Sequence, residues 1–507
     1  MFVGKGVVRL CTTLPMEWDS EVACRGDWGS LPPGIIDAVL RLLSASPLWR
    51  REAPTLRLVN RRWCQEVDRH VVTVFPHHSR EIQSDDLPAL LKFNQLTSLD
   101  ATRFVRAYEA THLPSIHVLS RLGHLTKLEL QNDSWNGIGV GALLTLRGLT
   151  SLTLETGVQT HVPEKDLKTL TQLPLRELSI RCPIQKMASF FEGCRSLERL
   201  TAQALPGDFD FSFDPVIMNG LTALKLSFRP VGHSFEIPDL QSLSRVTSLQ
   251  ELDLTSFCSN DLEWLLHLSS LRQLSVTVAA TAVVSSVAFL HVVQRLMQFR
   301  VKSIASQSLD ITDVIRRGTA LKELHLENFA IDCRSIQENL GALESLALHK
   351  CSLQNSQYFL EDLKPLGRLA VQCLRDPFAH LRLGSADLSR LSVLKVALHE
   401  VDSIAVICRL RHLISLGLRT PYPLSVDALK QLGTLPNLLE FGVSPPFPES
   451  TVSVFLKSDA VKHLEILYLS DEDSNFNASS LQWLKSSVPQ LKIETRVSFF
   501  DSFMKVL

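Results

Sequence analysis

Glycines near residue 140 and two adjacent histidines are the first residues whose types and spacing could do chemistry. The run NGIGVGALL, Asn136 to Leu144, could form a phosphate-binding loop, because glycines let a backbone approach a dinucleotide closely. Gly137, Gly139 and Gly141 give G-x-G-x-G, however, and the dinucleotide pattern is G-x-G-x-x-G. We therefore expect an ordinary loop there, and no cofactor.

Metal, redox and hydrolytic chemistry find no matching pattern either. His77 and His78 are adjacent, so they lack the four-residue helical spacing that a metal pair prefers, and we expect a solvated linker. The ten cysteines include no pair separated by two residues, which favours reduced thiols over a zinc knuckle or a redox dithiol. The chain contains no G-x-x-x-x-G-K-[ST], H-E-x-x-H or G-x-S-x-G motif. These observations predict a protein that is not an enzyme and that needs no metal.

The elements that must position any functional side chain repeat along the chain. The pattern L-x-x-L-x-[LIV] recurs with starts 22 to 29 residues apart. Its alternation predicts a short strand with the apolar residues on one face. Leucines at every third residue before the strand, as from Leu262 to Leu274, predict a helical or tight-turn stripe. Clear copies start at Leu125, Leu149, Leu175, Leu221, Leu249, Leu271, Leu321, Leu343, Leu366, Leu391, Leu413 and Leu464, and weaker ones at Leu96, Leu197, Leu296, Leu438 and Val488.

This pattern resembles the leucine-rich-repeat family from residue 96 to about 493. The resemblance implies an α/β solenoid of about 17 stacked units, with a curved parallel sheet and with helices or turns outside it. The family often has Asn or Cys eight residues after the first leucine; Cys351 fits, but Gly157 and Phe257 do not, so we expect no asparagine ladder. Residues 494–507 are rich in phenylalanine and are expected to cap the C-terminal end.

Charged residues recur at the positions that the concave face of such a stack would expose, between and just after the inward apolar residues. Acidic residues come early and basic residues come late, so the face is expected to be electrically divided. The basic part could hold an acidic or phosphorylated segment of a protein substrate. Alternatively, these are ordinary solvated side chains, and Glu327 and Asp471 interrupt the trend. The acidic positions are Asp100, Glu129, Glu155 and Asp253; the candidate substrate-binding positions are Arg300, Lys302, His325, His349, Lys350, Lys395 and Arg419.

A different pattern precedes the repeats. WGSLPPGIIDAVLRLL and LRLVNRRWCQEVD, which begin at Trp28 and Leu56, each have apolar residues at helical spacing. Two short helices cannot build a self-sufficient core, so they need a partner surface. They either contact another protein or close the N-terminal end of the solenoid.

Residues 28–71 are similar to the F-box family: a Leu-Pro opening, an amphipathic helix and the cluster LRLVNRRW. Only Asn60 departs, where the family usually has Cys or Ser. The resemblance implies docking on a Skp-family adaptor and, through it, on a cullin, as the substrate-recognition subunit of an SCF-type ubiquitin ligase. The implied adaptor-binding residues are Leu31, Pro32, Ile35, Ile36, Val39, Leu40, Leu56, Val59 and Trp63. A scaffold or signalling solenoid with a helical end cap is the alternative.

Composition limits the remaining possibilities. The formal net charge of −1 argues against a nucleic-acid partner. The apolar run from Gln273 to Gln294 could pass for a membrane span, but its serines and threonines favour a buried strand and helix of one repeat.

No secretory signal is evident, which predicts an intracellular protein of the cytoplasm or the nucleus, although a weak transit-peptide pattern remains. Residues 1–27 are expected to be a disordered extension, and residues 72–95 a linker and N-terminal cap.

Overall fold

The computed structural model describes two compact units, residues 1–183 and 184–507. The predicted extension 1–27 and the predicted F-box-like module 28–71 lie outside the described residues, as does residue 497 onward of the predicted C-terminal cap. The described residues are 73–74, 96–101, 121–132, 140–156, 164–184, 196–204, 219–228, 240–259, 262–278, 286–305, 308–355, 366–372, 390–397, 403–419, 424–444, 464–470 and 492–496.

The first unit contains a parallel sheet whose strands pair in chain order. It has an additional two-residue strand within the predicted linker 72–95, where Thr73 pairs in register with Ser98. The strands are β1 (Thr73–Val74), β2 (Ser98–Ala101), β3 (Lys127–Asn132), β4 (Ser151–Thr156) and β5 (Glu177–Ile184), with the helices α8 (Val140–Leu143) and α9 (Glu164–Leu170).

The second unit contains a longer parallel ladder of the same kind. Its strands are β6 (Arg199–Ala204), β7 (Ala223–Phe228), β8 (Glu251–Ser259), β9 (Gln273–Val278), β10 (Gln298–Ser303), β12 (Glu323–Glu327), β14 (Ser345–His349), β16 (Arg368–Gln372), β17 (Val393–Ala397), β18 (Ser415–Arg419), β19 (Glu440–Ser444), β20 (Ile466–Ser470) and β21 (Lys492–Arg496). The last strand runs past the expected solenoid end at residue 493. A second sheet pairs β11 (Leu309–Asp310), β13 (Phe329–Asp332) and β15 (Ser352–Gln354).

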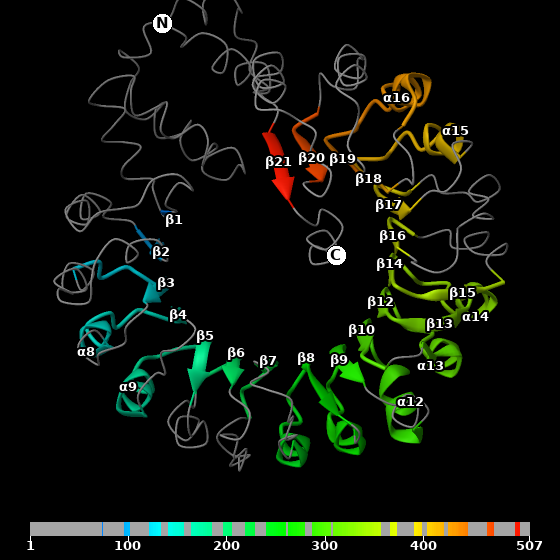
Figure 1. The fold of residues 1–507 in the computed structure, drawn as a ribbon. Coiled ribbons are helices and arrows are strands. Elements are labelled where there is room, and N and C mark those ends of the chain that lie inside the picture. The colour runs from blue at the N-terminus through cyan, green and yellow to red at the C-terminus, as the bar shows by residue number, and fades with distance from the viewer. Residues whose placement is uncertain are drawn as a thin grey trace, which may run out of the picture. The chain divides into compact units, whose positions relative to one another are not determined.

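The helices of the second unit lie on one side of the long ladder (Figure 1). None of the helices in the described ranges lies on the opposite side of this sheet, which corresponds to the predicted concave face and which we call the helix-free face. The α-helices are α12 (Val287–Val293), α13 (Thr312–Arg317), α14 (Cys333–Asn339), α15 (Ser403–Ile407) and α16 (Val426–Leu432), and the 3₁₀-helices are η3 (Gln241–Arg245) and η4 (Glu263–His267).

The leucines that recur at every third residue have a direct structural explanation. The backbone N–H of Leu265 donates to the carbonyl of Leu262, that of Leu268 to Leu265, and that of Leu271 to Leu268. These are i to i−3 bonds, and a 3₁₀-helix has three residues per turn, so successive leucines point the same way. All four are at most 3% exposed. The predicted turn stripe is therefore confirmed here as η4 and the turn that follows it.

The alternation within each strand sets the core. Leu324, Leu346, Leu369 and Leu394 are paired in register on successive strands, and each is at most 3% exposed. Because side chains alternate along a strand, a shift of one residue would bring the polar set into this core. The weaker repeat copies obey the same register, since β2, β6, β10, β19 and β21 all form where those copies predict strands.

The apolar stretch from Gln273 to Gln294 contains β9 and α12. Ser286 caps α12 by accepting the backbone N–H of Phe289 at 3.2 Å, and the ring of Phe289 packs edge-on against Phe299 with centroids 5.6 Å apart. The interpretation as a buried strand and helix is confirmed. None of the helices in the described ranges has the length and apolar character that a membrane span requires.

Two strands of neighbouring repeats end at residues in the left-handed region. Asn328 follows β12 with φ 65°, and Lys350 follows β14 with φ 54°. The Asn328 amide donates to the carbonyls of Ser303 at 3.1 Å and Ala305 at 2.9 Å in the preceding repeat. The side chain of Asn328 thus connects this turn to the preceding repeat by two hydrogen bonds. Asparagine suits the position because its short polar side chain tolerates a positive φ.

Candidate binding face

Two rows of side chains cross the strands of the helix-free face in the second unit. The register places one row between the two buried residues of each strand; we call it the central row. It consists of Lys225, Asp253, Ser275, Arg300, His325, Ala347, Ala370, Lys395 and Gly417. The other, two residues earlier on each strand, is called the edge row. It consists of Glu251, Gln273, Gln298, Glu323 and Ser345.

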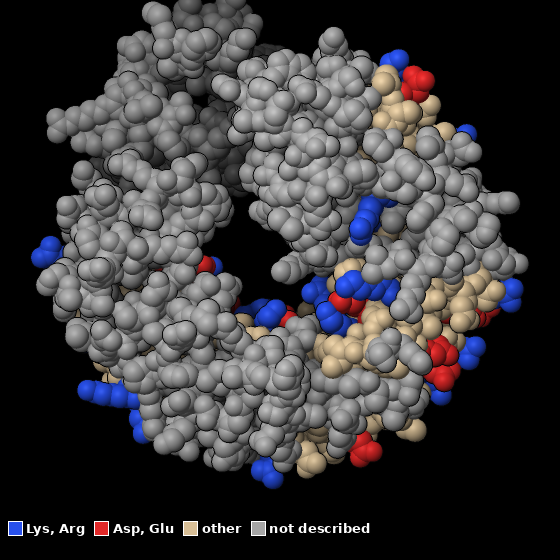
Figure 2. Space-filling model, viewed as in Figure 1, with Lys and Arg blue, Asp and Glu red and all other residues tan. Residues whose placement is uncertain are grey.

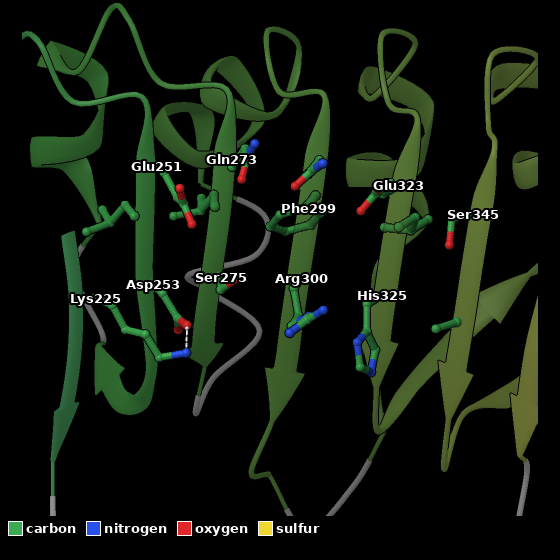
Figure 3. A pocket seen from close by; sticks show the side chains of 15 residues that line it. Lys225, Glu251, Asp253, Gln273, Ser275, Phe299, Arg300, Glu323, His325 and Ser345 are labelled. Atoms are coloured by element: carbon green, nitrogen blue, oxygen red, sulfur yellow. Dashed lines mark ion pairs between the residues drawn. The ribbon is translucent and has the colours of Figure 1, made fainter. Parts of the chain in front are cut away.

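A pocket of about 230 Å³ lies over these rows, between β7 and β14. Figure 3 shows Glu251, Gln273 and Glu323 along one level of the pocket. Ser275, Arg300 and His325 lie along the other level. The lining is therefore polar, with carboxylates, carboxamides and one guanidinium on neighbouring strands.

Most charges near the pocket are paired across strands. The Lys225 ammonium lies 2.7 Å from the carboxylate of Asp253 (Figure 3). The guanidinium of Arg199 lies 3.6 Å from the carboxylate of Glu251. Arg300 and Glu323, by contrast, have no ion-pair partner among the residues that the structure describes.

His325 adds a polar ring to the pocket without adding charge at neutral pH. Burial, the largest cause, lowers its pKa together with the neighbouring Arg300, His349 and Lys302, to about 3. Within the described ranges its Nδ1 has no hydrogen-bond partner. A neutral imidazole carries one N–H donor and one acceptor, so His325 is suited to hydrogen bonding and not to ion pairing.

The carboxylate of Glu327 lies two residues after the central row and contacts side chains on both neighbouring strands. The Glu327 carboxylate forms an ion pair with Lys302, whose Nζ lies 2.8 Å from Oε1 of Glu327. The Nδ1 of His349 lies 3.9 Å from the same oxygen. These residues are in register on β10, β12 and β14. Glu327 therefore neutralises part of the basic cluster that the sequence predicts.

Lys395, like His325, is a predicted basic residue whose pKa is lowered in the folded protein. It is 4% exposed, and burial lowers its pKa to about 6, although the carboxylate of Glu440 opposes the shift. A lysine with this pKa is mostly neutral at pH 7. It therefore adds little positive charge to the face.

The structure groups the predicted substrate-binding residues unequally. Arg300, Lys302, His325 and His349 lie on three neighbouring strands. Farther along the ladder, Lys395 is on β17 and Arg419 on β18. Lys350 is exposed but belongs to the turn after β14 and not to a row of the face. Whether these residues bind a substrate remains a prediction.

Acidic and basic side chains lie next to each other within each unit, so the charges are not simply divided between an acidic and a basic half. Asp253 is paired with Lys225 in the second unit, and in the first unit Glu129 lies 2.9 Å from Lys127. Figure 2 shows blue and red atoms side by side where β10 and β12 lie in Figure 1. The edge row was not predicted from the sequence; its signal is the polar residue two positions before Asp253, Arg300 and His325.

Other candidate sites gain no chemistry from the structure. Burial raises the pKa of the free thiols of Cys333 and Cys351 to about 12, and that of Cys408 to about 11, which makes them poor nucleophiles. Gly141 lies in α8 with open space around it, so no close backbone approach requires a glycine. Within the described ranges, no three His, Cys, Asp or Glu side chains come together as a metal site would need.

Comparison with known proteins finds no matching family model and no significant match among curated proteins. Several solved structures are similar. An internalin from Listeria monocytogenes has 16% identity, a TM-score of 0.33 and coverage of 74% of this chain and 93% of its own. The mouse RP105/MD-1 complex gives 13% identity, a TM-score of 0.41 and coverage of 80% of each chain. A leucine-rich-repeat protein from Leptospira interrogans gives 17% identity, a TM-score of 0.26 and coverage of 80% and 91%.

These likenesses are too weak to support an inference about function. The fold follows from this chain's own features: a repeat of 22 to 29 residues, parallel strands paired in register, and buried leucine rows. Each repeat buries its apolar face only against its neighbours. The described strands of this chain therefore belong to a leucine-rich-repeat solenoid.

Proposed function

We propose that this protein binds another protein through the helix-free face, as the substrate-recognition subunit of an SCF-type cullin-RING ubiquitin ligase. The observation that carries the binding role is the polar pocket between β7 and β14. Neighbouring strands lie about 4.8 Å apart, so its rows present closely spaced hydrogen-bonding groups to a partner. A rigid array of this kind can hold a segment without catalysing a reaction.

The ligase role is supported by sequence alone. Leu31-Pro32, the amphipathic segment from Ile35 and the cluster ending in Trp63 are similar to an F-box, although these residues lie outside the described ranges. On this proposal they dock on a Skp-family adaptor, which joins the protein to a cullin. The substrate is then a protein held by the solenoid, in the cytoplasm or the nucleus.

A non-ligase scaffold is the second candidate. The pocket is equally compatible with it, because its lining begins at Lys225 and does not involve the F-box-like residues. In that case the N-terminal helices close the solenoid and contact no adaptor. Partner binding through the helix-free face is common to both candidates.

Co-purification of the full chain with a Skp-family adaptor separates the two candidates. The double substitution Leu31→Ala, Trp63→Ala is expected to abolish adaptor binding while circular dichroism stays unchanged, because it removes the apolar docking contacts. A matched control removes exposed apolar side chains from the solenoid, Leu266→Ala and Val287→Ala, and should retain binding.

Failure of the wild-type chain to bind any adaptor from its own proteome would contradict the ligase proposal and leave the scaffold. Equal loss of binding in the control pair would mean that the N-terminal substitutions act nonspecifically.

A further inference from the structure

The pocket leaves one cation and one anion uncompensated. Arg300 and Glu323 line it, and within the described ranges neither takes part in an ion pair. We infer that this pocket selects a protein segment presenting an acidic and a basic side chain two residues apart, the acid for Arg300 and the base for Glu323. The inference rests on the proposed protein-binding role of the helix-free face.

The positions of the two charges fit a single extended segment. Arg300 is in the central row on β10, and Glu323 is in the edge row on the adjacent strand β12. Adjacent strands are about 4.8 Å apart and the rows are two residues apart, which gives a diagonal of roughly 8 Å. Alternate side chains of an extended peptide are about 6.6 to 6.8 Å apart. Long side chains such as Glu and Lys cover the difference, so one segment reaches both residues.

The remaining lining is suited to the backbone of such a segment. Gln273 and Ser275 (Figure 3) and Gln298, which is in register with Glu323, offer both donors and acceptors in the pocket. Asp253 is engaged by Lys225, so it does not compete strongly for a ligand cation. Main-chain groups of the segment would therefore find partners while its two charged side chains fix the register.

Charge counting favours a carboxylate over a phosphate as the anion. Glu251 and Asp253 are paired with Arg199 and Lys225, so Arg300 and Glu323 remain and the lining has no excess of positive charge. The neutral imidazole of His325 adds no positive charge. A phosphate carries nearly two charges at pH 7 and would be repelled by Glu323. The lack of excess positive charge also disfavours a nucleic-acid backbone, which needs several cations.

Immobilised peptide pools with random flanks test this selection directly, with the full-length chain as the soluble binder. The pools differ in their three central positions: Glu-X-Lys, Lys-X-Glu, Glu-X-Glu, Lys-X-Lys, Gln-X-Gln, Gln-X-Lys, Lys-X-Gln, Glu-X-Gln, Gln-X-Glu, phosphoserine-X-Lys and Lys-X-phosphoserine. One mixed-charge pool is expected to retain about three- to fivefold more protein than Gln-X-Gln, the range of partly exposed ion pairs. Selection of either Glu-X-Lys or Lys-X-Glu satisfies the inference, because the bound segment can run across the strands in either direction.

Single substitutions assign the selection to each residue. Arg300→Gln should make the selected mixed-charge pool equivalent to the pool of the same order in which Gln replaces the acid. Glu323→Gln should make it equivalent to the pool in which Gln replaces the base. Arg316→Gln and Glu338→Gln change exposed helix residues outside the pocket and should leave the preference intact.

Three results would overturn the inference: a preference for either phosphoserine pool, equal retention of the mixed and neutral pools, or an equal effect of the helix controls. Retention of no pool would in addition contradict the protein-binding role of the face. The adaptor experiment is independent of these pools, so the two proposals can fail separately.

Discussion

Strands β10 and β12 differ from their neighbours β14 to β18 on the same sheet. Along β10 and β12, buried and partly exposed residues alternate. All five residues of β14 are buried, and so are the first four of β18. We call β9, β10 and β12 the open segment and β14, β16, β17 and β18 the covered segment. One repeat pattern thus produces strands whose side chains on the helix-free face are partly exposed and strands whose side chains there are buried.

Side-chain size and charge follow this difference. The central row of the open segment contains Ser275, Arg300 and His325, whereas the covered segment contains Ala347, Ala370, Lys395 and Gly417. Ala347 and Ala370 are at most 2% exposed. A charge is costly where water is excluded, which is why Lys395 loses its proton more easily. Partner binding is therefore expected over the open segment.

The largest expected effect is the pH dependence caused by Lys395. Its pKa is about 6 in the folded protein and 10.5 in the reference state, so the unfolded chain binds more protons between these values. Stability therefore rises with pH across that window by up to about 1.4 kcal/mol per unit, and is unaffected by this group below pH 6. Between pH 6.5 and 9, wild type should gain about 3 kcal/mol relative to Lys395→Met in urea unfolding.

Lys322→Met provides the control, because Lys322 is exposed and paired with Glu344. This variant should follow the wild-type pH dependence. Parallel curves for wild type and Lys395→Met would mean that Lys395 is solvated, and the covered segment would have to be redefined.

Matched enlargements on the central row test the two segments directly. Ala370→Leu adds volume to a buried site and should destabilise the protein by about 1–3 kcal/mol. Ser275→Leu, on the partly exposed row of β9, should change stability by less than about 0.5 kcal/mol. Chemical unfolding of both variants is the measurement. Equal effects would show that the segments do not differ in packing.

The two left-handed turns predict opposite changes. Asn328→Ala, after β12, loses two hydrogen bonds and keeps a strained φ, which should cost about 2 kcal/mol. Lys350→Asn, after β14, should gain up to about 1 kcal/mol, because asparagine tolerates its φ of 54°. Thermal unfolding of both variants provides the comparison. A Lys350→Asn variant less stable than wild type would mean that this turn lacks equivalent acceptors.

The smallest effect is expected for Glu327, which lies at the junction of the two segments. Glu327→Gln weakens contacts with Lys302 and His349, and pairs of this kind contribute less than about 1 kcal/mol. Raising the salt concentration should reduce the difference from wild type if it is electrostatic. Salt-independent destabilisation above about 1 kcal/mol would instead indicate a packing role.

Much of the fold could be predicted because its signals are local. The spacing of Leu262, Leu265 and Leu268 encodes a 3₁₀ turn, and each L-x-L places two side chains on the buried face of a strand. The short strand β1 escaped prediction because two residues carry too little periodicity. Among the candidate site residues, positions on the strands could be predicted but charge states could not. Lys395 and Arg300 occupy the same position in their repeats, yet the lysine is buried and the arginine partly exposed.

The repeat register was therefore determined by the sequence itself, because hydrophobic alternation acts within a few residues. Only the tertiary structure decided which charges of the helix-free face are paired, neutral or available. Lys225 meets Asp253, and Lys302 meets Glu327, across distances of more than 20 residues in the chain. Burial of β14 likewise depends on the whole environment of the strand. Pairing and desolvation are properties of spatial neighbours, and a linear pattern does not specify them.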